Sequence, residues 1–160
     1  MPGLPPLIEE DVQLLDAALD ELLRKSESTA ALVIDKGGPL INQRGAVGQF
    51  DTTTIAALAA GSFCATQAIA ERLGETNFAC IYQQGESHSA LFCDIDEDVL
   101  LIVIFKAGVS VGAVKHYAAT TVHQVSHQLQ RARIRSPDQT VDLVSMNTLD
   151  AADIFHKKPA

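Results

Sequence analysis

The sequence predicts an α+β fold, an α/β sandwich in which a five-stranded, mainly antiparallel sheet has helices on both faces. Helical and strand patterns follow one another in the order α-β-β-α-β-β-β-α. Each connection between successive strands is short enough for a hairpin, except the one that contains the middle helix. A chain of 160 residues can bury one core without disulfides, so we expect a single domain.

The first and third helices are predicted from the spacing of their apolar residues. Apolar side chains recur three and four positions apart from Ile8 to Leu22, and again through residues 110–135. This spacing is typical of helices with one buried face. The first of these helices is expected to end near Lys25. The segment Ser136-Pro137-Asp138 follows the other and predicts where it ends.

The strands are predicted from short apolar runs that are separated by turn residues. Lys36-Gly37-Gly38-Pro39 separates the first two runs, and Gly85-Glu86 separates the third from the fourth. The last run, VLLIVIFK, is the most apolar in the chain and is expected to lie at the centre of the sheet. The five runs are residues 30–35, 40–43, 78–84, 89–95 and 99–106.

The middle helix is unusual because residues 52–70, nineteen in succession, carry no charge. Asp51 precedes three threonines and can accept hydrogen bonds from the first-turn amides, which predicts that the helix begins near Thr52. Glycine is common just beyond a helix C-terminus, so the helix is expected to stop at Gly74.

At about 100° per residue, this helix has two distinct faces. One stripe is predicted to face the core and consists of Ile55, Leu58, Ser62, Thr66, Ile69 and Leu73. The opposite stripe consists of Ala57, Ala60, Gly61, Cys64, Ala68 and Glu71. A solvent-facing stripe would ordinarily carry Lys, Glu and Arg. We therefore interpret the second stripe as a contact surface for another protein chain.

There are two other interpretations of the middle helix. It could be buried on all sides inside one large core. It could also span a membrane, because nineteen residues are long enough to do so. Its threonines, serine, glutamine and glycine make it too polar for hydrocarbon, so we expect no membrane span.

The charge balance and the cysteines limit the partners and the compartment. A net charge of −8 disfavours nucleic acid and anionic membrane surfaces, and fits a basic protein partner better. The start, MPGLPPLIEE, lacks the basic and apolar regions of a secretion signal, so we expect the protein in the cytoplasm. Cys64, Cys80 and Cys93 are then expected to be free thiols. Cys80 and Cys93 would lie opposite each other if Gln84 pairs with Ser89.

The sequence does not support a site for metal ions, nucleotides or catalysis. His116, His123 and His127 share one face of the third helix, but that face is expected to be solvated and has no further ligand nearby in sequence. The alternating aspartates of residues 94–98 begin like a calcium loop, yet the required glycine and glutamate do not follow. No GxxxxGK[ST] loop and no nucleophile motif occurs. We therefore expect no metal, no cofactor and no active site of its own.

The order of elements and three stretches of sequence resemble the roadblock superfamily, and within it the bacterial MglB-type regulators of small Ras-like GTPases. The stretches are LVIDKGGPLI in the first hairpin, FDTTTIAALAAGSFCATQAIAERLGE across the middle helix and VLLIVIFKAGVSVGAVK from the last strand into the third helix. The resemblance covers about residues 8–135. We expect a single domain of roadblock/profilin-like fold at residues 1–135, followed at 136–160 by a mostly flexible tail with a short helix at 148–156.

This resemblance implies a homodimer in which the middle helices of two subunits pair and their third strands join the two sheets into one. It also implies a partner, a small Ras-like GTPase of the MglA type, whose hydrolysis of GTP the dimer accelerates by reshaping the switch regions, without an arginine finger. The positions of this sequence that match the family's dimer and partner contacts are those of the second stripe: Ala57, Ala60, Gly61, Cys64, Ala68 and Glu71.

Two functions other than that of a GTPase-activating protein are compatible with the sequence. One is a roadblock adaptor that bridges protein partners without changing hydrolysis. Neither role needs a catalytic residue in this chain, so the sequence does not separate them. The other is a sensor of pH or metal built on the three histidines of the third helix, which lack a completing ligand in the nearby sequence.

Overall fold

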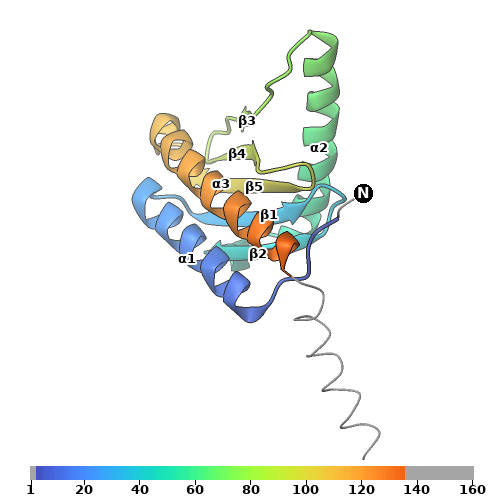
Figure 1. Cartoon of the computed structure of the whole chain (residues 1–160). Helices are drawn as coiled ribbons and strands as arrows, with labels where there is room; N and C mark the ends of the chain where they lie inside the picture. Colours follow the sequence, from blue (N-terminus) through green and yellow to red (C-terminus); the bar gives the residue numbers. More distant parts are fainter. Residues whose placement is uncertain (1–2, 136–160) are drawn as a thin grey trace, which may run out of the picture.

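A computed structural model describes residues 3–135 of the chain (Figure 1). Its α-helices and strands follow the predicted order, with a short 3-10 helix before the middle α-helix. The expected tail at residues 136–160, with its short helix at 148–156, lies outside the described residues. The elements are α1 (Glu9–Ser26), β1 (Ala30–Asp35), β2 (Leu40–Gly45), η1 (Val47–Gln49), α2 (Thr52–Arg72), β3 (Cys80–Gln83), β4 (His88–Asp94), β5 (Val99–Lys106) and α3 (Val111–Ile134).

The strands form one antiparallel sheet in the order β2-β1-β5-β4-β3. The predicted sheet is therefore confirmed, and β5 lies at its centre, with every residue from Val99 to Phe105 buried. The strand predicted at residues 78–84 is shorter in the structure, because only Cys80–Gln83 pair with β4. Gln83 lies opposite Ala90, which is the register in which Gln84 would face Ser89. The result is a short strand at the edge of the sheet.

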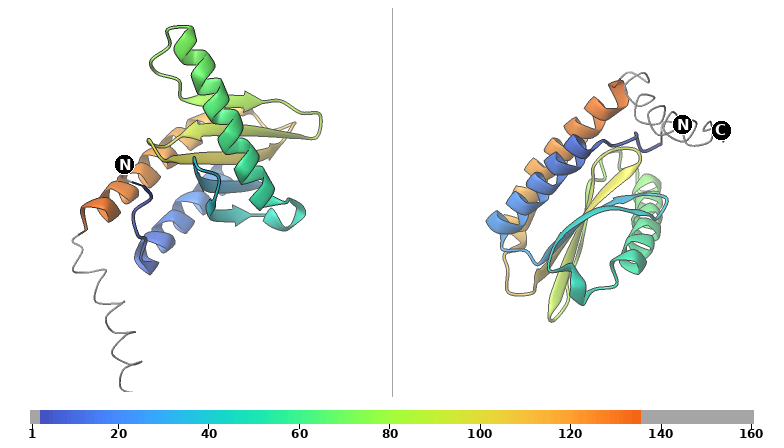
Figure 2. Two further views of the ribbon diagram at one scale, coloured as in Figure 1. Left: turned by 90° about the vertical axis from the view of Figure 1, so that its right-hand side faces the viewer. Right: turned by 90° about the horizontal axis from the view of Figure 1, so that it is seen from below.

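Helices cover both faces of this sheet (Figure 2). Successive residues of β5 point to opposite faces, so this one strand contributes to two cores. Leu101 and Phe105 pack with α1 and α3 in one core, whereas Leu100 and Ile102 pack with α2 in the other. Because β5 is apolar on both sides, loss of either helical layer would expose large side chains to water.

A buried carboxylate joins the two helices that share one face. Asp11, in the first turn of α1, is fully buried. It accepts hydrogen bonds from both terminal nitrogens of Arg135, each at 2.8 Å, and from the side-chain amide of Gln128 at 2.6 Å. The backbone N–H of Ile8 also donates to it, at 2.9 Å. A buried carboxylate is tolerated only where it is paired in this way, so the network fixes the start of α1 against the end of α3.

The Asp11 network makes the fold sensitive to acid. The hydrogen bonds from Arg135 hold the pKa of Asp11 at about 2, below its usual value of 3.8. Because the pKa is lower in the folded protein, the ionised carboxylate stabilises the fold fully above about pH 4, and this contribution is lost as the pH falls toward about 2. We expect Asp11→Asn to lower the free energy of unfolding by about 2 kcal/mol at neutral pH and by much less at about pH 2.5.

Urea denaturation of the wild-type and variant proteins at the two pH values measures this difference. Glu97→Gln removes an exposed carboxylate from the β4–β5 turn and serves as the control. It should change the free energy of unfolding by less than about 0.5 kcal/mol at either pH. If Asp11→Asn were equally destabilising at both pH values, the loss would come from packing and not from ionisation.

Candidate protein-interaction surface

Helix α2 is held to the sheet mainly through its N-terminal half. The Asp51 carboxylate accepts hydrogen bonds from the backbone N–H and the hydroxyl of Thr54, at 3.2 and 2.6 Å, which confirms the predicted N-cap. Phe63 is fully buried. The centre of its ring lies 5.1 Å from that of Phe78 and 5.5 Å from the ammonium nitrogen of Lys36. The C-terminal part of the helix extends past the sheet (Figure 1).

The prediction of which side of α2 faces the core is wrong. The stripe assigned to the core contains Leu58, Ile69 and Leu73, whose side chains are 68%, 59% and 75% exposed. The buried residues of the helix are Ala56, Ala59, Ala60, Phe63 and Ala70. Large side chains from the sheet, such as Ile102, occupy much of the space beneath the helix, so the helix packs there mainly through small residues, with Phe63 as its one large buried side chain.

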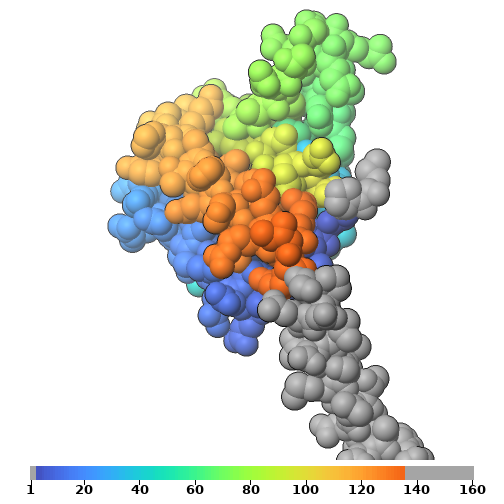
Figure 3. Space-filling model, viewed as in Figure 1, coloured from blue at the N-terminus to red at the C-terminus, as the bar shows by residue number. Residues whose placement is uncertain are grey.

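The exposed side of α2, which we call the outer face, has no charged side chain along most of its length. It consists of Ala57, Leu58, Gly61, Ser62, Cys64, Ala65, Ala68 and Ile69. Leu58 and Ile69 are large and apolar, and the other residues are small. Another chain could cover this face without removing charged groups from water, which is a property of the centres of protein interfaces. Figure 3 shows that the C-terminal half of α2 stands out from the rest of the surface.

Most of the residues predicted for partner contact lie on the exposed side of α2. Five of the six are exposed: Ala57, Gly61, Cys64, Ala68 and Glu71. Ala60 is 3% exposed and packs in the core beneath the helix, so it does not belong to the outer face. Sequence reasoning missed Leu58 and Ile69, because it assumed that the largest side chains of a helix point inward.

Gly61 lies in the middle of α2 without a packing reason in its own chain. A methyl group added at this position would meet no atom within 4 Å outside the helix backbone. Glycine inside a helix costs about 1 kcal/mol relative to alanine. Its presence is favourable where another group needs the space, and a second helix that crosses the outer face closely would need it.

The outer face adjoins a groove and an open strand edge. The groove has a volume of about 330 Å³, and Leu58 and Ser62 line it from the helix while Gln83 and Ile104 line it from the sheet. Strand β3, to which Gln83 belongs, is the last in the strand order, so within residues 3–135 one row of its backbone N–H and C=O groups has no strand partner. The outer face, the groove and the β3 edge form one continuous region, which we call the α2–β3 surface.

Other residues that the sequence brings to attention do not assemble into a site. Three exposed histidines lie on α3: His116, His123 and His127. Within residues 3–135, no three His, Cys, Asp or Glu side chains gather as a metal site would require. Asp96 and Asp98 pair with Arg133 of α3, at 2.8 and 3.4 Å, so these carboxylates fasten the β4–β5 turn to the helix.

In the part of the chain that the structure describes, α2 is the one helix whose length and composition would allow it to cross a membrane. Ala56, Ala59 and Phe63 pack against the sheet, while Leu58 is exposed on the other side. Burial on all sides is therefore excluded for this helix within one chain. A helix that covers a core along one side can have the same length and composition as a membrane span, and α2 is such a helix.

The sequence matches the model of the Roadblock/LC7 domain over residues 14–105, and the chain belongs to this family. Its structure is similar to that of Myxococcus xanthus MglB, with a TM-score of 0.75 and 25% sequence identity, over 82% of this chain and 98% of that one. The gliding protein MglB from Thermus thermophilus gives a TM-score of 0.74 and 26% identity, over 82% and 99% of the two chains.

A structure described as MglB with a tetrameric arrangement is also similar, with a TM-score of 0.76 and 26% identity over 82% of this chain and 99% of that chain. A comparison of the sequence with curated proteins gave no match. The resemblance to bacterial MglB-type roadblock proteins and the predicted roadblock/profilin-like fold are thus confirmed.

The two sides of α2 should differ in their effect on stability. Phe63→Ala removes a fully buried ring and should lower the free energy of unfolding by about 3–5 kcal/mol. Leu58→Ala shortens an exposed side chain, and in the monomer it should cost less than about 1 kcal/mol. Urea denaturation at a concentration where sedimentation shows a monomer measures both values. A larger loss for Leu58→Ala than for Phe63→Ala would mean that the helix is turned as the sequence predicted.

Proposed function

We propose that this protein is a dimeric regulator that binds a small Ras-like GTPase and stimulates its hydrolysis of GTP. The observation that carries the proposal is the α2–β3 surface, where an uncharged helix face lies beside an open strand edge. Membership of the Roadblock/LC7 family and similarity to MglB support it.

A second copy of this chain is the first occupant that we propose for the α2–β3 surface. Two β3 strands could pair edge to edge, because each open edge presents backbone donors and acceptors at the spacing that another strand needs. Gly61 and Ala65 would let two α2 helices approach closely. Leu58 and Ile69 would then lie between subunits, away from water. Similarity to an MglB with a tetrameric arrangement supports assembly of several copies.

The GTPase is the second occupant, and its identity as an MglA-type protein rests on the resemblance to MglB-type regulators. The net charge of −8 favours a partner with basic contact residues and would speed their encounter. Glu71, exposed at the end of the uncharged segment, is a carboxylate that such a partner could meet. The dimer and the GTPase would share the α2–β3 surface.

We propose further that the groups that act on GTP belong to the GTPase, and that this protein supplies no arginine finger. Such a finger must be free to reach the transferred phosphate. Arg44, Arg133 and Arg135 are held in ion pairs with Asp20, Asp96 and Asp11. Arg24, Arg72 and Arg131 are exposed, and of these only Arg72 lies on α2, next to the α2–β3 surface. Arg72 is therefore the arginine to test as a finger.

Phosphate release by a purified MglA-type GTPase, with and without this protein, tests the proposed function. We expect an acceleration of at least about tenfold, a modest value for an activating protein. Arg72→Ala should keep this acceleration, whereas a loss of acceleration with unchanged binding would identify Arg72 as a finger. Binding of the GTPase without any acceleration would instead favour a roadblock adaptor that bridges partners without changing hydrolysis.

Ala68→Arg should weaken both dimerisation and stimulation of the GTPase while the fold stays intact. The substitution places charge and bulk on the outer face, where Ala68 is exposed and makes no part of the core. Sedimentation should show a dimer dissociation constant that is raised at least about tenfold, which corresponds to about 1.4 kcal/mol. Circular dichroism and urea denaturation check that the fold is unchanged.

Ala119→Arg is the matched control, because it makes the same substitution at an exposed alanine of α3, on the opposite side of the sheet. Association and stimulation should be the same as in the wild type. If both variants weakened association equally, the added charge itself would be responsible, and not its position on the outer face. If neither did, the outer face would not be the interface.

A further inference from the structure

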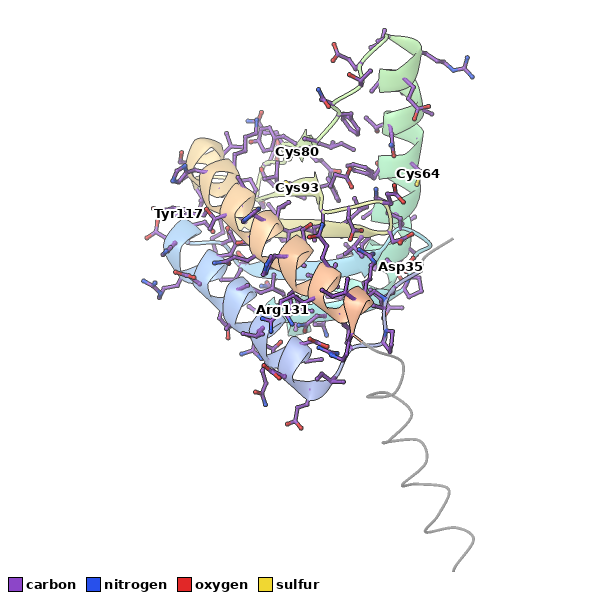
Figure 4. All side chains as sticks on the ribbon, viewed as in Figure 1. Asp35, Cys64, Cys80, Cys93, Tyr117 and Arg131 are labelled. Carbon is purple, nitrogen blue, oxygen red and sulfur yellow. The ribbon has the colours of Figure 1, made fainter. Side chains whose placement is uncertain are left out.

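Two cysteines face each other where the edge strand β3 meets β4. Cys80 pairs with Cys93 in the strand register, and their sulfur atoms lie 2.8 Å apart (Figure 4). The backbone N–H of Asp94 donates to the carbonyl of Ala79, so the adjacent cysteines occupy a position between ladder hydrogen bonds. In such pairs the Cα atoms approach to about 4.5 Å, which lies within the range of about 4.4 to 6.8 Å found for disulfides. The two side chains can therefore be joined with little movement of the backbone.

The two thiols differ in access and in acidity. Cys80 is exposed, whereas Cys93 is buried beneath α3. The hydrogen bond with Cys93 lowers the pKa of the Cys80 thiol, and the positive charge of Lys115 on α3 acts in the same direction. The same hydrogen bond, together with burial, raises the pKa of the Cys93 thiol. Cys80 is thus the thiol that an oxidant can reach and that ionises more readily, and Cys93 is held beside it.

We propose that Cys80 and Cys93 form a reversible thiol–disulfide pair, oxidised by a peroxide, whose disulfide fastens β3 to β4. Both residues belong to one chain, so the proposal is independent of the proposed function. Cysteine pairs that oxidise in a reducing compartment are commonly transient and respond to oxidants.

The reaction balances with hydrogen peroxide as the oxidant. The Cys80 thiolate attacks one oxygen of the peroxide, the O–O bond breaks, and Cys80 becomes a sulfenic acid while the departing hydroxide takes up the proton that the Cys80 thiol released. The sulfur of Cys93 then attacks the sulfur of Cys80, the S–O bond breaks, and a second water leaves with the proton of Cys93. The two thiols lose two hydrogen atoms, and the peroxide becomes two waters. A small dithiol reverses the change by thiol–disulfide exchange.

The position of the pair determines what the disulfide does. Strand β3 has four residues and only β4 as a neighbour in the described sheet, and its side chains are mostly exposed. Short edge strands with few buried contacts open more readily than the strands of a core. A covalent link from Cys80 to Cys93 prevents β3 from separating from β4, and so reduces this local opening.

Intact mass spectrometry of the full chain tests the oxidation. The protein should carry Cys64→Ser, because Cys64 is the third cysteine and is exposed on α2, where it could link two chains. Hydrogen peroxide added to the reduced protein should lower its mass by about 2 Da, and dithiothreitol should restore it. A gain of about 32 Da on the peptide that contains Cys80, without the mass loss, indicates a sulfinic acid and would overturn the proposal, as would a disulfide between two chains.

Single variants in the same Cys64→Ser background assign the roles of the two sulfurs. Cys80→Ser should abolish the mass loss, and because Cys80 is exposed the variant should fold. Cys93→Ser should leave a sulfenic acid on Cys80 that a 1,3-dicarbonyl reagent traps. Cys93→Ala, which avoids a buried hydroxyl, repeats this test if the serine variant does not fold. Trapping of a sulfenic acid on Cys93 in the Cys80→Ser protein, with no trapping on Cys80 in the Cys93 variants, would contradict the assignment.

Hydrogen exchange measures the effect on the strand. At a protein concentration where sedimentation shows a monomer, the amides of Cys80–Gln83 should exchange at least about tenfold more slowly in the oxidised protein than in the reduced one. Cys80→Ser should exchange at the same rate with and without peroxide. Equal exchange in the oxidised and reduced proteins that retain both cysteines would show that the disulfide does not fasten β3.

Discussion

The fold depends on one central strand that is apolar on both of its faces. Because β5 is buried from Val99 to Phe105, the sheet needs a helical layer on each side. The two layers are built differently. Helices α1 and α3 bring large side chains such as Leu19 and Leu129 to one face, and the Asp11 network joins their ends. On the other face, α2 alone presents mostly alanines, and β3 is left largely exposed. The domain is thus thickly covered on one side and thinly on the other.

The distribution of charge follows the same asymmetry. Within residues 3–135, most ion pairs lie on the side of α1 and α3, as in the pairs of Arg44 with Asp20 and of Arg133 with Asp96. The pair of Lys36 with Asp94, at 2.7 Å, lies instead beside Phe63 of α2. Exposed pairs such as Arg44 with Asp20 add little stability, but charged groups resist being covered because they must give up water. Helix α2 has no charge between Asp51 and Glu71. Covering the outer face of α2 would therefore remove fewer charged groups from water than covering α1 and α3. The thin core and the lack of charge on this helix both favour it as the place where another chain would bind.

Most of the fold could be predicted because its signals are local. The VLLIVIFK run, the Asp51 cap and Gly74, whose φ of 80° suits a residue beyond a helix end, each act over a few neighbours. The orientation of α2 could not be predicted in this way. The apolar pattern of a helix shows only how its own residues are arranged around its axis. The side that faces the sheet also depends on the space that the side chains of the sheet leave, and there Ala56 is buried while Leu58 is exposed. The contact between Asp11 and Arg135 joins positions 124 apart and has no local signal at all.

The segments with the fewest packing contacts in the domain lie next to each other. Binding of a partner to them would therefore also make them more ordered. Strand β3 has a single neighbour in the described sheet, and the C-terminal half of α2 extends past it. Such segments open first, and a partner that covers them adds its binding free energy to their stability. Part of that energy is spent on ordering the segments, so a surface that is already ordered binds more tightly. A link between Cys80 and Cys93 would supply some of this order within one chain. Oxidation of the pair and covering of the α2–β3 surface would therefore act on the same strand, one through a covalent bond and the other through contact.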